Sequence, residues 1–134
     1  MLVKRHPPRH VAAGVLLPFA LLLTACPQNI TIHIADGSTA DHLTFTFSEN
    51  RGLRRSVQIR GLWVRLCDTE RKVWEIEGMA GADTIERIIY GVVPQGFLVR
   101  TPAERLGPGC YEVDVAGSGE SERFVVQENG NVIS

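Results

Sequence analysis

Two histidines and two aspartates gather near the first predicted turn, where they could in principle bind a metal ion. His33 and His42 flank this turn, and Asp36 and Asp41 lie between them. Zinc sites use defined Cys and His spacings, and calcium loops place acidic residues at regular intervals. The four residues match neither pattern. We therefore predict no metal site and no other cofactor.

Two pairs of carboxylates could supply an acid and a base for hydrolysis, namely Glu75 with Glu77 and Glu112 with Asp114. Residues two positions apart on a strand share one face of the sheet. Because the alternate positions are apolar, we expect these carboxylates on the solvated face. Ser118 lies between two glycines without an adjacent base, which indicates a hairpin turn rather than a nucleophile. We predict that the protein is not an enzyme.

The N-terminus is basic and then apolar. Lys4, Arg5 and Arg9 precede an apolar stretch from Val11 to Leu23. This stretch of about 13 residues has the length of a signal-peptide core and is shorter than the roughly 20 residues that cross a bilayer as a helix. The pattern predicts a cleaved secretory signal over residues 1–25.

The residues Leu23-Thr24-Ala25-Cys26 resemble the lipobox of bacterial lipoproteins. The resemblance implies cleavage before Cys26 and acyl chains on its thiol and new amino group. Residues 26–29 would form this lipidated cysteine and a short tether, so the protein would be bound to the membrane of the bacterial cell envelope. Pro27 is not acidic, which in this family favours the outer membrane, on the side that faces the periplasm. One acyl chain binds only marginally, but two or three make release negligible.

Composition limits the class of partner. The chain has 14 basic and 15 acidic residues. Cleavage removes three basic residues, so 11 basic and 15 acidic residues remain and the net charge is −4. An acidic domain argues against nucleic acid as a partner, because nucleic-acid binding needs a basic surface. The two remaining cysteines, Cys67 and Cys110, would enter a compartment that permits disulfides.

Apolar and polar residues alternate through most of the remaining sequence, which is typical of strands half-buried in a sheet. The phase changes at Gly61, where we expect a β-bulge. The stretch Thr84–Val93 would also suit a helix, but its β-branched residues and the following Pro94 favour a strand. Strands are expected at residues 30–34, 43–48, 57–66, 72–77, 84–93, 97–100, 111–116 and around 124–126.

Seven or eight short strands, with turn signals about every 8 to 12 residues, predict an all-β fold. We expect an antiparallel Ig-like β-sandwich over residues 30–128. The polar residues 129–134 are expected to form a frayed tail.

The segment from Leu106 to Val115 resembles the next-to-last strand of immunoglobulin-like and fibronectin-type domains. In those domains a Pro-Gly pair precedes a tyrosine whose hydroxyl bonds back to the chain, the tyrosine corner. The resemblance gives this structural role to Tyr111. Trp63 on the third predicted strand also agrees with this resemblance, because immunoglobulin domains carry a tryptophan on their third strand. The second strand has no cysteine, so the sequence departs from the antibody pattern there.

The resemblance also bears on the two cysteines. In Ig-like topologies the third and sixth strands are antiparallel neighbours. Cys67 would end one and Cys110 would begin the other, with both side chains pointing outward. We expect a cross-strand disulfide between them; the alternative is two free thiols.

Two groups of charged residues are candidate binding surfaces. One loop between the second and third predicted strands carries three arginines that could face anionic lipid headgroups: Arg51, Arg54 and Arg55. The alternative is a solvated loop paired with acids such as Glu49. The opposite end would carry the polar rim of a partner surface: Asp68, Glu70, Arg100 and Arg105.

These observations predict a membrane-anchored, non-enzymatic envelope lipoprotein that binds another envelope protein or assists assembly. One alternative is an inhibitor of a periplasmic or rival hydrolase. Another is an anchoring subunit of a secretion or outer-membrane assembly machine. The oligomeric state is not predicted.

Overall fold

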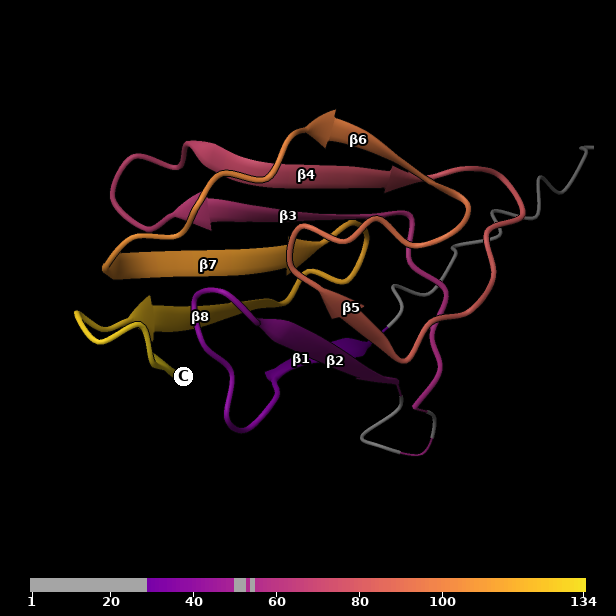
Figure 1. Ribbon diagram of the computed structural model, residues 1–134. Coiled ribbons are helices and arrows are strands. Elements are labelled where there is room, and N and C mark those ends of the chain that lie inside the picture. Colours follow the sequence, from indigo (N-terminus) through magenta and orange to yellow (C-terminus); the bar gives the residue numbers. More distant parts are fainter. Residues whose placement is uncertain (1–28, 50–52, 54) are drawn as a thin grey trace, which may run out of the picture.

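The computed structural model describes residues 29–49, 53 and 55–134 and contains no helix in this part of the chain. Nine strands form two antiparallel sheets (Figure 1). The strands are β1 (Ile30–Ile34), β2 (Thr44–Glu49), β3 (Gly61–Leu66), β4 (Lys72–Gly78), β5 (Arg87–Ile89), β6 (Phe97–Thr101), β7 (Gly109–Val115), β8 (Ser121–Val126) and β9 (Val132–Ile133).

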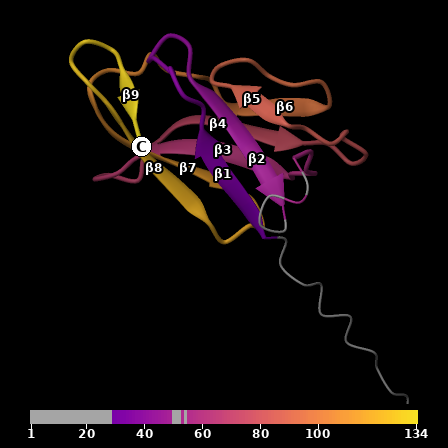
Figure 2. The ribbon, with the colours of Figure 1, turned by 90° about the horizontal axis from the view of Figure 1, so that it is seen from below.

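The two sheets form a β-sandwich, which confirms the predicted fold class. The small sheet has the order β1-β2-β5, and the large sheet has the order β6-β4-β3-β7-β8-β9. Seen from below, β1 and β2 lie across the strands of the large sheet (Figure 2). The order β3-β7-β8 corresponds to the C, F and G strands of an immunoglobulin sandwich.

Alternation of side chains builds the core between the sheets. Phe45 of the small sheet is fully buried, and its ring centroid lies 6.1 Å from that of Phe124 in the large sheet. Phe124 in turn stacks on Tyr111, with 5.5 Å between the centroids. The buried hydrophobic residues all lie between Ile30 and Val126. Among the described residues the buried core thus lies within residues 30–126, with Val132 of β9 packed against it, and we expect residues 29–134 to fold as a domain.

The sandwich has two ends, which differ in their relation to the start of β1. The near end holds the first residue of β1, the end of β2 and the β7–β8 turn. The far end holds the connections after β1, β3, β6 and β8, at the left of Figure 1. Since β1 follows residue 29 directly, the near end is the one closest in sequence to Cys26.

The C-terminal residues do not fray as expected. Val132 pairs with Val126 in the β8–β9 ladder, and its N–H donates to the carbonyl of Ser38 at 3.2 Å. The Ala40 N–H donates to the carbonyl of Gly130 at 2.8 Å. These bonds add a ninth strand and extend the domain past residue 128. The prediction missed β9 because a strand of two residues shows no alternation, although its ladder partner β8 lies only six to eight positions earlier.

Two local predictions also need correction. The expected strand at Thr84–Val93 is reduced to β5. Ile85 forms only an isolated bridge with Val57, and the ladder between β2 and β5 ends at Ile89. No register shift occurs at Gly61, which is the first residue of β3. The phase changes there because the chain passes from the bridge with Ile85 to the large sheet.

Candidate functional site

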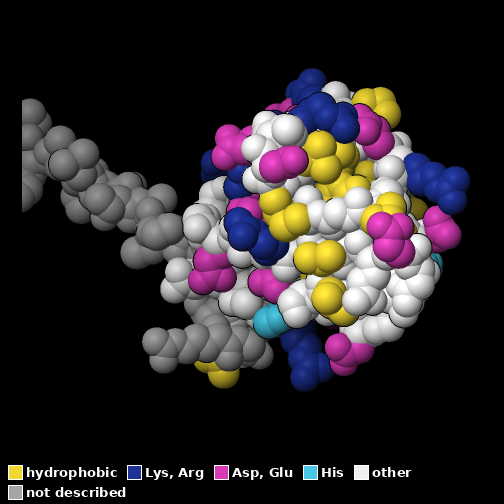
Figure 3. All heavy atoms as spheres, turned by 90° about the vertical axis from the view of Figure 1, so that its left-hand side faces the viewer, with side chains coloured by type: hydrophobic (Ala, Val, Ile, Leu, Met, Phe, Trp, Pro, Cys, Tyr) yellow, Lys and Arg dark blue, Asp and Glu magenta, His cyan; other side chains and the backbone are white. Residues whose placement is uncertain are grey.

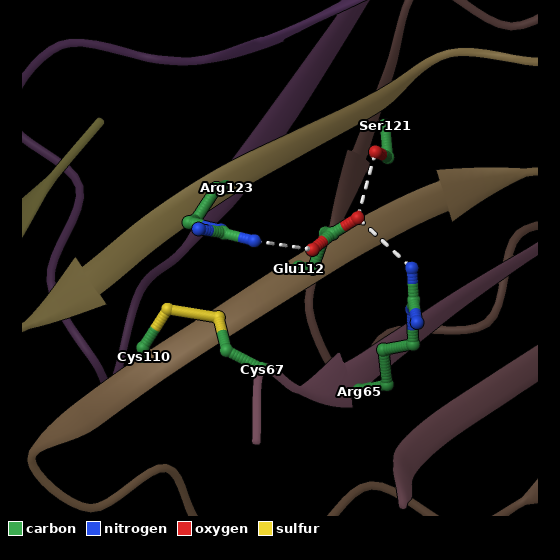
Figure 4. The surroundings of a disulfide bond; sticks show 6 residues. All are labelled: Arg65, Cys67, Cys110, Glu112, Ser121 and Arg123. Carbon is green, nitrogen blue, oxygen red and sulfur yellow. Dashed lines mark hydrogen bonds and ion pairs between the residues drawn. A yellow bond between two sulfur atoms is a disulfide. The ribbon is translucent and has the colours of Figure 1, made fainter. Parts of the chain in front are cut away.

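A disulfide joins Cys67 and Cys110 across β3 and β7, as the sequence predicted (Figure 4). Their Cα atoms are 5.5 Å apart, and the Cys67 N–H donates to the Cys110 carbonyl at 3.2 Å. The bond therefore links two neighbouring strands of the large sheet. It closes a sequence separation of 43 residues.

Arg65 lies at the centre of an ion-pair network on the outer face of the large sheet. Its guanidinium donates to Asp114 and to Glu112 at 2.9 Å each, and to Glu70 at 3.1 Å. Figure 4 shows Glu112 between Arg65, Arg123 and Ser121. The network connects β3, β7 and the turn after β3.

The environment of Glu112 holds it ionised. The Ser121 hydroxyl donates to it at 2.7 Å and lowers its pKa, and the charges of Arg65 and Arg123 act in the same direction. Burial opposes this shift. A general acid needs a raised pKa near the working pH, and the pKa of Glu112 is shifted the other way.

Each glutamate of the second pair also forms an ion pair with a basic side chain. Lys72 donates to Glu75 at 2.7 Å, and Arg100 pairs with Glu77. The ammonium of Lys72 also lies 5.1 Å from the ring centroid of Trp63. The two glutamates contribute to the solvated outer face of β4.

Tyr111 makes the hydrogen bond expected of a tyrosine corner. Its hydroxyl donates to the carbonyl of Gly107 at 2.8 Å. Burial raises the pKa of the phenol, so the hydroxyl keeps its proton over a wide pH range. The bond ties the start of β7 to the connection that precedes it.

A second tyrosine with a related role escaped the sequence analysis. The Tyr90 hydroxyl lies 2.8 Å from the carbonyl of Glu104 and 3.2 Å from that of Val73, and its ring meets Trp74 edge-on at 5.1 Å. Burial raises the pKa of Tyr90. No local pattern marked this residue, because the carbonyls that it bonds lie 14 and 17 positions away.

The predicted partner surface is only partly brought together. Asp68 and Glu70 lie in the turn after β3, and Arg105 lies in the connection after β6, so these three are at the far end. Arg100 instead lies on β6, where it pairs with Glu77.

The two far-end loops are themselves joined. Arg71 and Glu104 form an ion pair of 2.6 Å between the β3–β4 turn and the β6–β7 connection. The pKa of Glu104 is lowered by the hydrogen bond from Arg71. The loops that carry Asp68 and Arg105 are therefore in contact through these side chains.

Hydrophobic side chains gather across the middle of the far end, with charged side chains around them (Figure 3). The exposed apolar residues of the loops at this end include Val92, Pro102, Ala103 and Pro108. Val92 alone is 55% exposed. An apolar centre with a polar border is the usual anatomy of a protein–protein interface.

Of the three predicted membrane-facing arginines, the structure describes only Arg55. Arg51 and Arg54 are outside the residues that the structure describes, as is the predicted lipidation site Cys26. Arg55 is exposed and lines a groove over the small sheet together with His33 and Arg87.

His33 and His42 do not form a metal centre with Asp36 and Asp41. In residues 29–49, 53 and 55–134, no three His, Cys, Asp or Glu side chains come together in a way that could hold a metal ion.

No protein-family model, curated protein or solved structure matches this chain. The described residues contain no helix that is long and apolar enough to cross a membrane.

Proposed function

We propose that the protein is a bacterial envelope lipoprotein, anchored through acyl chains at Cys26, whose β-sandwich binds another envelope protein without catalysing a reaction. The observation that carries this proposal is the lipobox-like sequence Leu23-Thr24-Ala25-Cys26 immediately before the first strand. Outer-membrane attachment, on the periplasmic side, is part of the proposal because Pro27 is not acidic.

The distance between the anchor and the domain supports a fixed orientation. Ile30 lies four positions after Cys26, a reach of at most about 14 Å. The near end would therefore lie close to the lipid surface, and the far end would point away from it. The Cys67–Cys110 disulfide is compatible with an oxidising compartment outside the cytoplasm.

The far end is the better candidate for contact with a partner protein. It combines exposed apolar residues such as Val92 and Ala103 with the charged residues Asp68 and Arg105. The Arg71–Glu104 ion pair holds its two loops against each other. A rigid surface loses little conformational entropy on binding.

The anchor is tested by labelling growing bacteria with radioactive palmitate. We expect label on the wild-type protein and on Thr24→Ser, which keeps a lipobox-like sequence. Cys26→Ser should carry no label. An unlabelled wild-type protein would contradict the anchor.

The binding surface is tested by photo-crosslinking in cells. A photoreactive residue at Ala103, on the far end, should capture one reproducible envelope protein. The matched control is Glu120, which is exposed in the β7–β8 turn at the near end. Capture of the same protein from both positions, or from neither, would refute the far-end surface. A captured hydrolase would instead favour an inhibitor, and a captured secretion or assembly component would favour an anchoring subunit.

A further inference from the structure

The outer face of the small sheet is polar and partly cationic. His33, Thr46 and Arg87 lie side by side on β1, β2 and β5, because the register pairs His33 with Thr46 and Thr46 with Arg87. Thr31 and Ser48 form the next pair toward the near end. Alternation turns the intervening residues, Ile32 and Phe47 among them, into the core.

A second guanidinium group, that of Arg55, reaches this face from the connection between β2 and β3. Val57 and Ile85 exchange backbone hydrogen bonds of 2.9 and 2.8 Å, which holds the segment after Arg55 beside the start of β5. The result is a groove whose polar lining comprises His33, Thr46, Ser48, Arg55, Glu86 and Arg87.

The charges of this groove differ from those of the large sheet. On the large sheet, Arg65, Arg100 and Arg123 each pair with a carboxylate. Among the described carboxylates, none forms an ion pair with Arg55 or Arg87. Glu86 is the single acidic residue in the lining, so two guanidinium groups face it with positive charge in excess.

We propose that this groove docks the domain on anionic phospholipid headgroups of the membrane that holds its anchor. Guanidinium groups recognise phosphate oxygens through paired N–H donors, and the hydroxyls of Thr46 and Ser48 supply further donors. The surface proposed for lipid contact thus includes side chains of β1, β2 and β5 as well as Arg55 of the arginine-rich loop.

The position of the groove agrees with a membrane ligand. His33 is three residues beyond the first residue of β1, a further rise of roughly 10 Å. Added to the tether of about 14 Å, this places the groove within about 25 Å of chain from Cys26. The domain would lean toward the small sheet, so that both the near end and the outer face of this sheet approach the headgroups while the far end stays away from them. This orientation rests on the proposed lipid anchor.

The test uses the domain that begins at Asn29, since it contains the buried core of the described residues. Its sedimentation with phosphatidylcholine vesicles is compared with that on vesicles that also contain phosphatidylglycerol, at low ionic strength. We expect binding only to the anionic vesicles. Each arginine near an anionic surface raises the binding affinity about 5-fold. The double variant Arg55→Gln/Arg87→Gln should therefore bind anionic vesicles about 30-fold more weakly than wild type.

The control Arg71→Gln/Arg123→Gln has the same net charge but leaves the groove intact, so its binding should remain near wild type. The melting temperatures of all variants establish that they are folded. Equal binding to both vesicles, or equal loss in the two double variants, would overturn the proposal. Binding of inorganic phosphate in the groove, without binding to the anionic vesicles, would also overturn the proposal. Palmitate labelling tests the anchor separately, so failure of one proposal does not conceal failure of the other.

Discussion

Removing the disulfide should be the most informative change to the stability of the fold. Cys67→Ala/Cys110→Ala releases a constraint over a sequence separation of 43 residues. In the chain-entropy model, a disulfide that closes a loop of this length reduces the entropy of the unfolded chain and so stabilises the fold by about 4 kcal/mol. That is a large part of the roughly 5–15 kcal/mol by which a domain is usually stable.

The native fold should nevertheless persist in the variant. The Cys67 N–H still donates to the carbonyl at position 110, and Arg65 still pairs with Glu112 and Asp114 across the same two strands. The loss should therefore appear as a lower free energy of unfolding, with the sheet intact before the transition. It should not abolish the β-rich circular dichroism spectrum.

Urea titration followed by tryptophan fluorescence measures this loss. Trp74 is 1% exposed, so unfolding should change its emission strongly. The double variant and the reduced wild type should unfold at similar, lower urea concentrations than the oxidised wild type. Cys110→Ala alone should match the double variant, because one missing sulfur is enough to break the bond.

Two results would refute this reasoning. The first is two alkylatable thiols in the unreduced domain, which would mean that the disulfide does not form. The second is the same urea midpoint before and after reduction. The bond would then contribute nothing measurable beyond the backbone ladder that already joins β3 and β7.

Three further variants test the core, the tyrosine corner and the ion-pair network. Tyr111→Phe leaves the Gly107 carbonyl without its donor and should lower the free energy of unfolding by about 1 kcal/mol in urea titrations. Trp74→Ala leaves a cavity and should cost about 3–5 kcal/mol in the same assay. Glu112 has a lowered pKa in the fold, chiefly because of Ser121, so its stabilisation is present above its ordinary pKa of 4.5 and is lost as the pH falls through the lowered value. Glu112→Gln should flatten this acid limb of a plot of urea midpoint against pH.

Matched variants distinguish these causes from general damage. Ser121→Ala keeps the carboxylate of Glu112 but removes its hydroxyl donor, so the acid limb should become shallower without disappearing. Coincident pH profiles for wild type and Glu112→Gln would contradict the assignment. Trp63→Ala, on the outer face, should cost much less than Trp74→Ala; equal losses would show that burial is not the cause. An unchanged midpoint in Tyr111→Phe would deny the corner its stabilising role.

Local alternation was sufficient to predict most strands and the inward faces of the sandwich. Phe45 and Phe47 are buried, as are Tyr111 and Val113, because a period of two repeats within each segment. The disulfide was also predictable, since the topology implied by the resemblance placed its two cysteines at the same end of adjacent strands.

Features that depend on distant pairing were not predictable in this way. Nothing near Val132 shows that its N–H will meet the distant Ser38 carbonyl, and the two residues of β9 are too few to show alternation, so this segment was expected to fray. The partners of Arg65 were equally hidden. Glu112 and Asp114 are 47 and 49 positions away, and only the register of β3 against β7 brings them to one guanidinium.

The path between β5 and β6 explains why the far end can be a rigid surface. Tyr90 follows β5 at the far end, whereas Phe97 begins β6 beside Gly78 at the near end, so the intervening chain runs back along the domain. As a result, β5 and β6 both run toward the far end, and the next connection emerges beside the β3–β4 turn. Tyr90 then bonds the carbonyl of Glu104, whose side chain holds Arg71. One half-buried phenol thus ties both loops together before any partner arrives. Tyr90→Phe should therefore weaken capture from Ala103 more than Tyr111→Phe does.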